Sequence, residues 1–159
     1  MTDNFIQLHK DNKVKVKIVD YDGNDTGEFL EFDIGDIDLT LKLDECYTKH
    51  KKNFEFIKNK LAIINKRQDF NNKSMLSRNE KESAEAIKEF YKKEEEALDL
   101  FLGKGGTKKM LNGRSFNLYT FDQILDELQP ITDMLKNQKE TITEEIIKKY
   151  SISNEEVLK

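Results

Sequence analysis

Tryptophan is absent from this 159-residue sequence, and cysteine and proline occur once each. The lone cysteine, Cys46, excludes an internal disulfide, which favours a reducing compartment. The N-terminal residues MTDNFIQLHKDN lack the basic-then-apolar pattern of a secretion signal. No apolar run approaches the roughly 20 residues that cross a bilayer. We therefore expect a cytoplasmic protein without a membrane-spanning segment.

Side chains that could carry catalysis or hold a metal are equally scarce. His9 and His50 are the only histidines, and neither has a second histidine or a cysteine at metal-ligand spacing. His50 falls on an apolar helical face, which favours a hydrogen-bonded structural histidine over a ligand or a base. Cys46, four residues earlier, could place a thiolate beside the imidazole, but nothing supplies the rest of such a site. A small buried hydrophobe is the preferred interpretation. We expect no enzyme, no metal site and no cofactor.

The charge of the chain is unevenly distributed. The net charge is −4, which argues against a duplex-binding protein. Residues 1–35 hold eight acidic residues and four lysines, whereas residues 49–67 hold one glutamate, six lysines and one arginine. An acidic N-terminal segment is thus followed by a basic helix. Apolar residues make up only 36% of the chain, which suggests that the core is completed against a partner.

The N-terminal part reads as β-structure. KVKVKIV, residues 13–19, alternates lysines with Val14, Val16 and Ile18, the period-two pattern of a half-buried strand. A turn-forming YDGNDTG precedes EFLEFDI, in which Leu30 and Phe32 alternate with acidic residues. The two runs predict an antiparallel hairpin. Residues 5–9 could add a third strand, so both a hairpin and a three-stranded sheet remain open over residues 5–36.

From about Leu41 the apolar period becomes helical. Seven residues recur at steps of four and three, as in helices that pack side by side: Leu43, Tyr47, His50, Phe54, Ile57, Leu61 and Ile64. Ser77 and Glu80 match a capping box that opens a second helix, which should end at Gly103 with EKES and KKEEE on its outer face. Thr120 and Gln123 match a second capping box, which predicts the start of a third helix.

The third helix should kink or restart near Gln129, because Pro130 lacks an N–H group and its ring clashes with the preceding turn. A shorter helical stretch is expected to open at Thr141 and Glu144. Residues 151–159 read as a frayed tail, or as one further turn. The chain is thus predicted to be a single α+β domain over residues 1–159. Its small N-terminal sheet packs on a helical region of three to four helices at residues 41–150.

A glycine-rich segment, DLFLGKGGTKKMLNG, invites comparison with a phosphate-binding loop. The Walker pattern requires a lysine directly after its last glycine and a strand before the loop. Here Thr107 follows Gly106, and a helix precedes the glycines. We interpret the segment as a helix stop at Gly103, a chain reversal, and a one-turn helix that Thr107 caps and Asn112-Gly113 ends.

Several lysines could bind a partner. HKKNFEFIKNK interleaves lysines with aromatics, as some single-stranded nucleic-acid-binding proteins do. Because Phe54 belongs to the apolar seam, a solvated face or a docking surface for an acidic partner is the preferred interpretation. The candidate partner-binding residues are Lys51, Lys52, Lys58, Lys108 and Lys109.

Four segments together carry a resemblance: KVKVKIVDYDGNDTGEFLEFDI, LKLDECYTKHKKN, EFYKKEEEALDLFLGKGGTKKMLNGR and YTFDQILDELQPI. The chain resembles small proteins from the tail-assembly region of phages and prophages of Gram-positive bacteria. It is also similar to the tail assembly chaperones of long-tailed phages. The shared pattern L-F-L-G-x-G-G-T-x-x-M-L-N-G is structural and brings no catalytic residues.

The resemblance implies a cytoplasmic protein of the bacterial host that binds the tape-measure protein and the tail-tube subunits. Such a chaperone keeps their apolar helices from aggregating until the tail polymerises. A permanent virion component, such as a tail or head-tail connector subunit, is the alternative. A nucleic-acid-binding regulator that uses residues 49–60 is less favoured. Whether the chain forms a homo-oligomer stays open.

Overall fold

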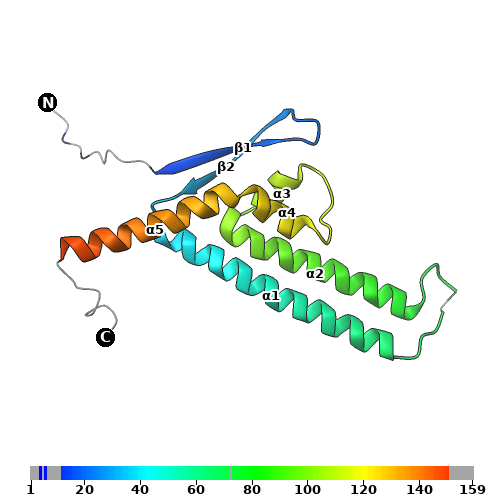
Figure 1. The fold of residues 1–159 in the computed structure, drawn as a ribbon. Helices are drawn as coiled ribbons and strands as arrows, with labels where there is room; N and C mark the ends of the chain where they lie inside the picture. The colour runs from blue at the N-terminus through cyan, green and yellow to red at the C-terminus, as the bar shows by residue number, and fades with distance from the viewer. Residues whose placement is uncertain (1–3, 5, 7–11, 72, 151–159) are drawn as a thin grey trace.

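The computed structural model describes residues 4, 6, 12–71 and 73–150. A β-hairpin, β1 (Lys13–Val19) and β2 (Asp25–Asp33), precedes five helices: α1 (Ile37–Lys66), α2 (Arg78–Leu102), α3 (Gly106–Leu111), α4 (Thr120–Glu127) and α5 (Gln129–Lys149). Figure 1 shows α1 and α2 as a long antiparallel pair, with the hairpin, α3, α4 and the start of α5 gathered at one end. The α+β prediction is confirmed.

The β-hairpin follows the predicted alternation. β1 and β2 are antiparallel, Val14 lies opposite Phe32 and Val16 opposite Leu30, and these side chains face the interior. The turn is held by the Asp20 side chain, whose Oδ1 accepts hydrogen bonds from the backbone N–H groups of Asp22 and Asn24, both at 2.9 Å. The third strand considered at residues 5–9 lies outside the described residues, apart from Ile6.

Side-chain caps determine where the two long helices begin. α1 starts at Ile37, four residues before the expected Leu41, because the Asp36 side chain accepts a hydrogen bond from the Asp38 N–H group and caps the helix there. The predicted capping box of α2 is confirmed: Ser77 and Glu80 each accept a hydrogen bond from the other's backbone N–H group.

The glycine-rich turn is closed by a side chain from α2. Gly103 ends α2 with a φ of 88°, as predicted. The Asp99 carboxylate then accepts hydrogen bonds from the Gly105 N–H group (3.2 Å), the Thr107 N–H group (2.9 Å) and the Thr107 hydroxyl (2.7 Å). The prediction that Thr107 caps α3 is therefore wrong. α3 begins one residue earlier, and Thr107 lies buried inside it with Asp99 as the acceptor.

Gly106 is required at the start of α3 for a steric reason. A Cβ atom there would lie 2.4 Å from Cβ of Leu102, so α3 could not pack so closely on the end of α2. As predicted, Asn112 ends the short helix in the left-handed conformation, with a φ of 48°. The glycines thus serve a tight reversal between two packed helices.

The last helix restarts at the proline, as expected. α4 ends at Glu127 and α5 begins at Gln129, with Pro130 in its first turn. The predicted Thr120 capping box is wrong. Thr120 lies within α4, its hydroxyl accepts a hydrogen bond from the Asn117 N–H group, and the Asn117 side chain accepts one from the Tyr119 N–H group. The separate helix expected at Thr141 is also wrong, because α5 runs unbroken to Lys149.

The main core lies where the hairpin meets the helices. Phe32 of β2 contacts Phe101 of α2 with ring centroids 5.2 Å apart. Leu98, Leu128 and Leu135, from α2, α4–α5 and α5, are buried in the same cluster. A second, smaller cluster joins α1 and α2 farther along, and consists of Ile57, Ile64, Ala86 and Phe90. The two helices therefore support each other beyond the end of the main core. Residues 151–159, predicted as a tail, lie outside the described residues.

The Asp99 carboxylate gives a first prediction. Asp99→Ala leaves the N–H groups of Gly105 and Thr107 without their acceptor, so we expect the free energy of unfolding to fall by about 1–3 kcal/mol. Urea denaturation followed by circular dichroism measures the change. Glu96→Ala removes the same charge from an exposed position of α2 and should change stability by less than about 0.5 kcal/mol. Equal losses in the two variants would contradict this role of Asp99.

Candidate partner-binding site

The seam between α1 and α2 is covered at one end by α4. The His50 ring of α1 stacks on Phe121 of α4, with centroids 3.8 Å apart and planes 8° from parallel. Tyr47 meets the Phe121 ring edge-on, with the two ring centroids 6.3 Å apart. Phe121 thus closes the seam next to the main core, and α4 determines where the uncovered part begins.

A buried carboxylate lies beneath His50. Glu94 of α2 is only 1% exposed. Its Oε2 atom lies 2.6 Å from Nδ1 of His50, and its Oε1 atom accepts a hydrogen bond from the Asn53 amide at 2.9 Å. Both carboxylate oxygens are therefore bound by side chains of α1, as a buried charge requires. The interpretation of His50 as a hydrogen-bonded structural residue is confirmed.

Glu94 is not among the residues expected from the sequence, because the charge pattern KKEEE places all five residues on the outer face of α2. That assignment is wrong for this residue. A signal was present: Phe90, Glu94, Ala97 and Phe101 recur at steps of four, three and four, which is the buried face of the helix. A carboxylate on such a face, level with a histidine and an asparagine of the neighbouring helix, indicates a buried polar contact.

Cys46 is fully buried beside this network. Burial, and secondarily the charge of Glu94, raises the pKa of Cys46 from 9.0 to about 12. The residue is thus a thiol in the folded protein at neutral pH, and the thiolate–imidazole pair considered for Cys46 and His50 is not formed. The preferred interpretation, a small buried hydrophobe, is confirmed.

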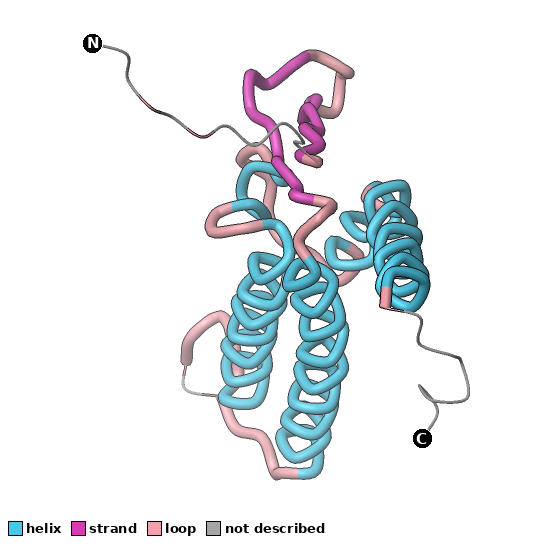
Figure 2. The backbone as a smooth tube through the Cα atoms, turned by 90° about the vertical axis from the view of Figure 1, so that its left-hand side faces the viewer, coloured by secondary structure: helices cyan, strands magenta, loops and turns pink. Residues whose placement is uncertain are grey.

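One face of the seam is open beside Phe121, at Tyr47, and beyond it, at Phe54. Figures 1 and 2 show the far halves of α1 and α2 running together, away from the sheet and α5. The side chains on this face are half-buried or more exposed, with Phe54 at 49% and Tyr47 at 45%. We define the apolar stripe as Tyr47, Phe54 and Leu61 of α1 with Ile87 and Tyr91 of α2.

The aromatic members of the stripe are held in place. Phe54 meets His50 at 6.0 Å and Phe90 at 6.1 Å, both edge-on. Tyr91 contacts Phe116 of the α3–α4 loop at 5.4 Å. The exposed rings are therefore fixed by rings beneath and beside them, which lowers the entropy lost when a partner covers them.

The structure separates the five candidate lysines. Lys51 and Lys58 follow Tyr47 and Phe54 by four residues each, so they border the apolar stripe on α1. Lys52 is rotated from Lys51 by about 100° and lies on another side of the helix. Lys108 and Lys109 lie on α3. The ammonium group of Lys108 is 4.0 Å from the Glu95 carboxylate, and that of Lys109 is 3.9 Å from the Glu28 carboxylate. Only Lys51 and Lys58 join the stripe.

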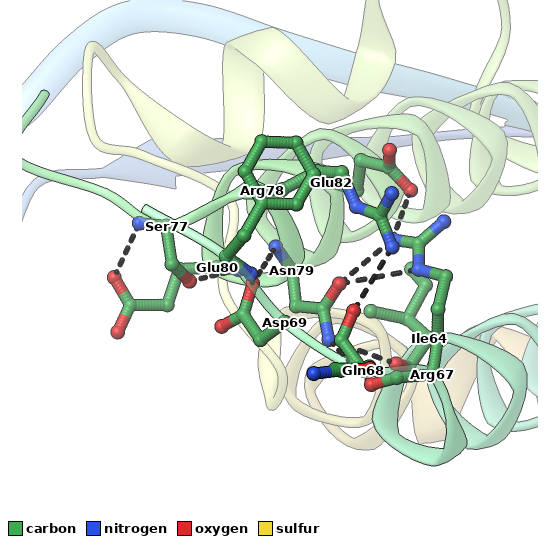
Figure 3. A network of polar contacts seen from close by, with 10 residues as sticks. Ile64, Arg67, Gln68, Asp69, Ser77, Arg78, Asn79, Glu80 and Glu82 are labelled. Carbon is green, nitrogen blue, oxygen red and sulfur yellow. Dashed lines mark hydrogen bonds and ion pairs between the residues drawn. The ribbon is translucent and has the colours of Figure 1, made fainter. Parts of the chain in front are cut away.

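The stripe ends in a shallow hollow at the tip of the helical pair. The hollow has a volume of about 530 Å³, and Ile87 and Ala84 line it together with polar residues of both helices. Figure 3 shows the polar network beside it. The Asn79 side chain donates to the carbonyls of Ile64 and Arg67, and so binds the end of α1 to the start of α2.

Two further contacts complete this network. The Arg67 guanidinium bonds the Glu82 carboxylate at 2.5 Å. Hydrogen bonds from the Ser77 side chain and the Asn79 N–H group lower the pKa of Asp69. Ser77 and Asn79 also start α2, so the connector is tied to the helix that follows it (Figure 3). The tip is therefore a fixed end to the stripe.

The glycine-rich turn offers no free cradle for a phosphate. The N–H groups of Gly105 and Thr107 donate to the Asp99 carboxylate, which occupies the position an anion would take. Within residues 4, 6, 12–71 and 73–150 no three His, Cys, Asp or Glu side chains are placed to share a metal ion. None of the helices in this part of the chain has the length and apolar character needed to span a bilayer.

Comparison with protein-family models, with curated proteins and with solved structures gives no match to this chain.

The buried carboxylate gives a second prediction. Glu94→Ala deprives His50 and Asn53 of their acceptor, and we expect a loss of about 2–4 kcal/mol in the free energy of unfolding. Urea denaturation of this variant is compared with Glu89→Ala, which removes an exposed carboxylate from the same helix. Replacing His50 and Glu94 together by leucine should recover part of the loss, because no charge is then buried. A Glu94→Ala variant as stable as Glu89→Ala would exclude a structural role for the network.

The Cys46 thiol gives a third prediction, on pH. Its pKa is higher in the folded chain, about 12, than the usual 9.0, so below pH 9 both states keep the proton and stability is unaffected. Between pH 9 and 12 only the unfolded chain loses it, and folding weakens by up to about 1.4 kcal/mol per pH unit.

This pH dependence is measured against a variant without the thiol. From pH 8 to pH 10 the wild-type protein should lose about 1 kcal/mol more unfolding free energy than Cys46→Ala. A thiol reagent at pH 8 should label Cys46 far more slowly in the native protein than in urea. Parallel pH profiles and equal labelling rates would show that the thiol is accessible and not buried.

Proposed function

We propose that this chain is a non-enzymatic tail assembly chaperone of a phage or prophage of a Gram-positive bacterium, acting in the host cytoplasm. The observation that carries the proposal is the apolar stripe, on which Phe54 and Tyr47 are about half exposed. The resemblance of four sequence segments to proteins of the tail-assembly region supports it. Together they favour a protein that covers a partner helix.

The spacing of the stripe fits a helix as its ligand. Tyr47, Phe54 and Leu61 follow one another at seven residues, and Lys51 and Lys58 repeat at the same interval. A third helix with apolar residues at heptad positions can pack along such a row at a shallow angle, as in a three-helix bundle. Acidic residues on one flank of that helix would meet Lys51 and Lys58.

The stripe supplies part of the binding energy, and the apolar side chains of the partner helix must supply the rest, since association itself costs several kcal/mol. Covering the exposed halves of Tyr47 and Phe54 contributes roughly 1 kcal/mol each, and the half-buried Leu61, Ile87 and Tyr91 add smaller amounts. Such a contact keeps an apolar helix of the tape-measure or tail-tube protein from aggregating. It also remains weak enough to be exchanged for the contacts of the assembled tail.

Co-expression with the tape-measure protein tests the function, and matched variants test the surface. We expect the wild-type chain to co-purify with that protein and to increase its soluble fraction. Phe54→Glu places a charge on the stripe, and Lys58→Glu reverses the charge at its border. Each should reduce recovery of the complex at least about tenfold. Ile63→Glu and Lys52→Glu change exposed residues on other sides of α1 and should bind as wild type.

Three results would count against the proposal. Absence of a complex, with no gain in soluble tape-measure protein, would reject the chaperone function. Equal binding by all four variants would reject the apolar stripe as its site. Detection of the chain in purified virions by mass spectrometry would indicate a permanent tail or connector subunit instead.

A further inference from the structure

His50 places a polar atom on the apolar stripe. The residue follows Tyr47 by three positions and precedes Phe54 by four, so it shares their side of α1. Glu94 lies beneath the ring at Nδ1, and Phe121 covers one ring face. The side chain is still 24% exposed. The exposed part of the ring therefore lies at the surface of the stripe, between Tyr47 and Phe54.

The second ring nitrogen, Nε2, belongs to this exposed part. The hydrogen bond of His50 is formed through Nδ1. Across the part of the chain that the structure describes, Nε of Arg78 is the single buried side-chain nitrogen or oxygen that lacks a hydrogen-bond partner. Nε2 of His50 has no partner among these residues either, so it must reach solvent. It is available to a ligand that covers the stripe.

The contacts of His50 fix both its orientation and its tautomer. Phe121 stacks on the ring at 3.8 Å, and Phe54 meets it edge-on at 6.0 Å, measured between ring centroids. The ionised Glu94 carboxylate can only accept a hydrogen bond, so Nδ1 of His50 must donate it. In the neutral imidazole the lone pair then lies on Nε2. His50 thus presents a hydrogen-bond acceptor of fixed direction.

A helix that covers the stripe must satisfy this acceptor. An apolar side chain over Nε2 would remove the nitrogen from water without a hydrogen bond, which is unfavourable. An ammonium group could donate, but it would lose its own water inside an apolar contact and would lie near Lys51, the next residue along α1. An uncharged donor, an amide or a hydroxyl group, meets neither difficulty.

A carboxylate is disfavoured at this position for two reasons. It has no proton to donate to Nε2, and it would lie above the buried charge of Glu94. Acidic side chains of α4 add to this effect. The pKa of Tyr47 is raised by burial first, and then by the charges that Cys46, Asp126 and Asp122 carry when ionised. The two aspartates of α4 therefore lie close to this end of the stripe.

We propose that Nε2 of His50 accepts a hydrogen bond from one uncharged polar side chain, an amide or a hydroxyl, on the apolar face of the partner helix. The bond fixes the register of that helix on the stripe, as one polar residue does in an otherwise apolar seam between helices. This inference rests on the proposed function, because it names a feature of the helix that the stripe covers.

Peptide titrations of the full-length, ¹⁵N-labelled protein at pH 8 test the proposal by nuclear magnetic resonance. The probes contain three repeats of Ile-Ala-Ala-Leu-Glu-Lys-Glu, with the central leucine kept or replaced by asparagine, glutamate or lysine. Their flanking glutamates repel one another in a self-pair and meet Lys51 and Lys58 in the complex. The amide signals of residues 47–61 should shift in a saturable manner, and the asparagine peptide should bind several-fold more tightly than the glutamate and lysine peptides.

A double-mutant cycle isolates the hydrogen bond. His50→Leu combined with Glu94→Leu removes Nε2 without leaving a buried charge. The affinity of the asparagine peptide relative to the leucine peptide should be about tenfold lower in this variant than in the wild-type protein. Circular dichroism checks that the variant folds. If it does not, the imidazole ¹⁵N signals of the wild-type protein and the ranking of the four peptides decide, and the proton should be found on Nδ1.

The remaining outcomes separate this contact from the chaperone function. A proton on Nε2, tightest binding by the glutamate or lysine peptide, or an unchanged ratio in the double variant would overturn the inference and leave the stripe in place. Absence of binding by all four peptides would overturn it together with the stripe as a helix site. Failure to bind the tape-measure protein, with the peptide results as expected, would reject the chaperone function alone.

Discussion

The arrangement of this protein depends on how α1 and α2 are held in register, and the buried Glu94 sets that register. Its two oxygens bond His50 and Asn53 of the facing helix. Sliding one helix along the other by a turn would leave the carboxylate buried without partners, a far greater cost than a shifted apolar contact. The same register places Phe54 beside Phe90 and brings His50 under Phe121. The stripe is thus aligned by a polar contact.

The helix ends show how far local sequence determines structure. The Ser77–Glu80 box, the stop at Gly103 and the restart at Pro130 could be predicted because each depends on residues within one turn. Thr107 and Thr120 were expected to cap helices and do not. At α3 the acceptor is Asp99, eight residues before Thr107, and at α4 the Asn117 side chain bonds the Tyr119 N–H group. A local pattern carries no information on Asp99, which arrives from the preceding helix. Asn117 does lie within three residues of Thr120, but the capping-box pattern tests only Thr120 and Gln123.

The candidate site was predictable in part for a similar reason. The apolar spacing of α1 indicated which residues share a face, and Lys51 and Lys58 were singled out near it. Spacing could not show that Tyr47 and Phe54 stay half exposed, because exposure depends on how far α4 extends over the pair. Lys108 and Lys109 look equally available in the sequence, yet each lies near an acidic residue, Lys108 near Glu95 of α2 and Lys109 near Glu28 of β2. Which lysines border an apolar surface is decided by packing.

The main core and the apolar stripe occupy different parts of the helical pair. The main core joins the hairpin to α2, α4 and α5, whereas the smaller cluster lies farther along α1 and α2, which run on together beyond the hairpin (Figure 1). The smaller cluster of Ile57, Ile64, Ala86 and Phe90 supports the stripe from beneath. A helix packed along the stripe would therefore leave the sheet undisturbed. The small apolar content of the chain is thus divided between two buried clusters and the half-exposed stripe.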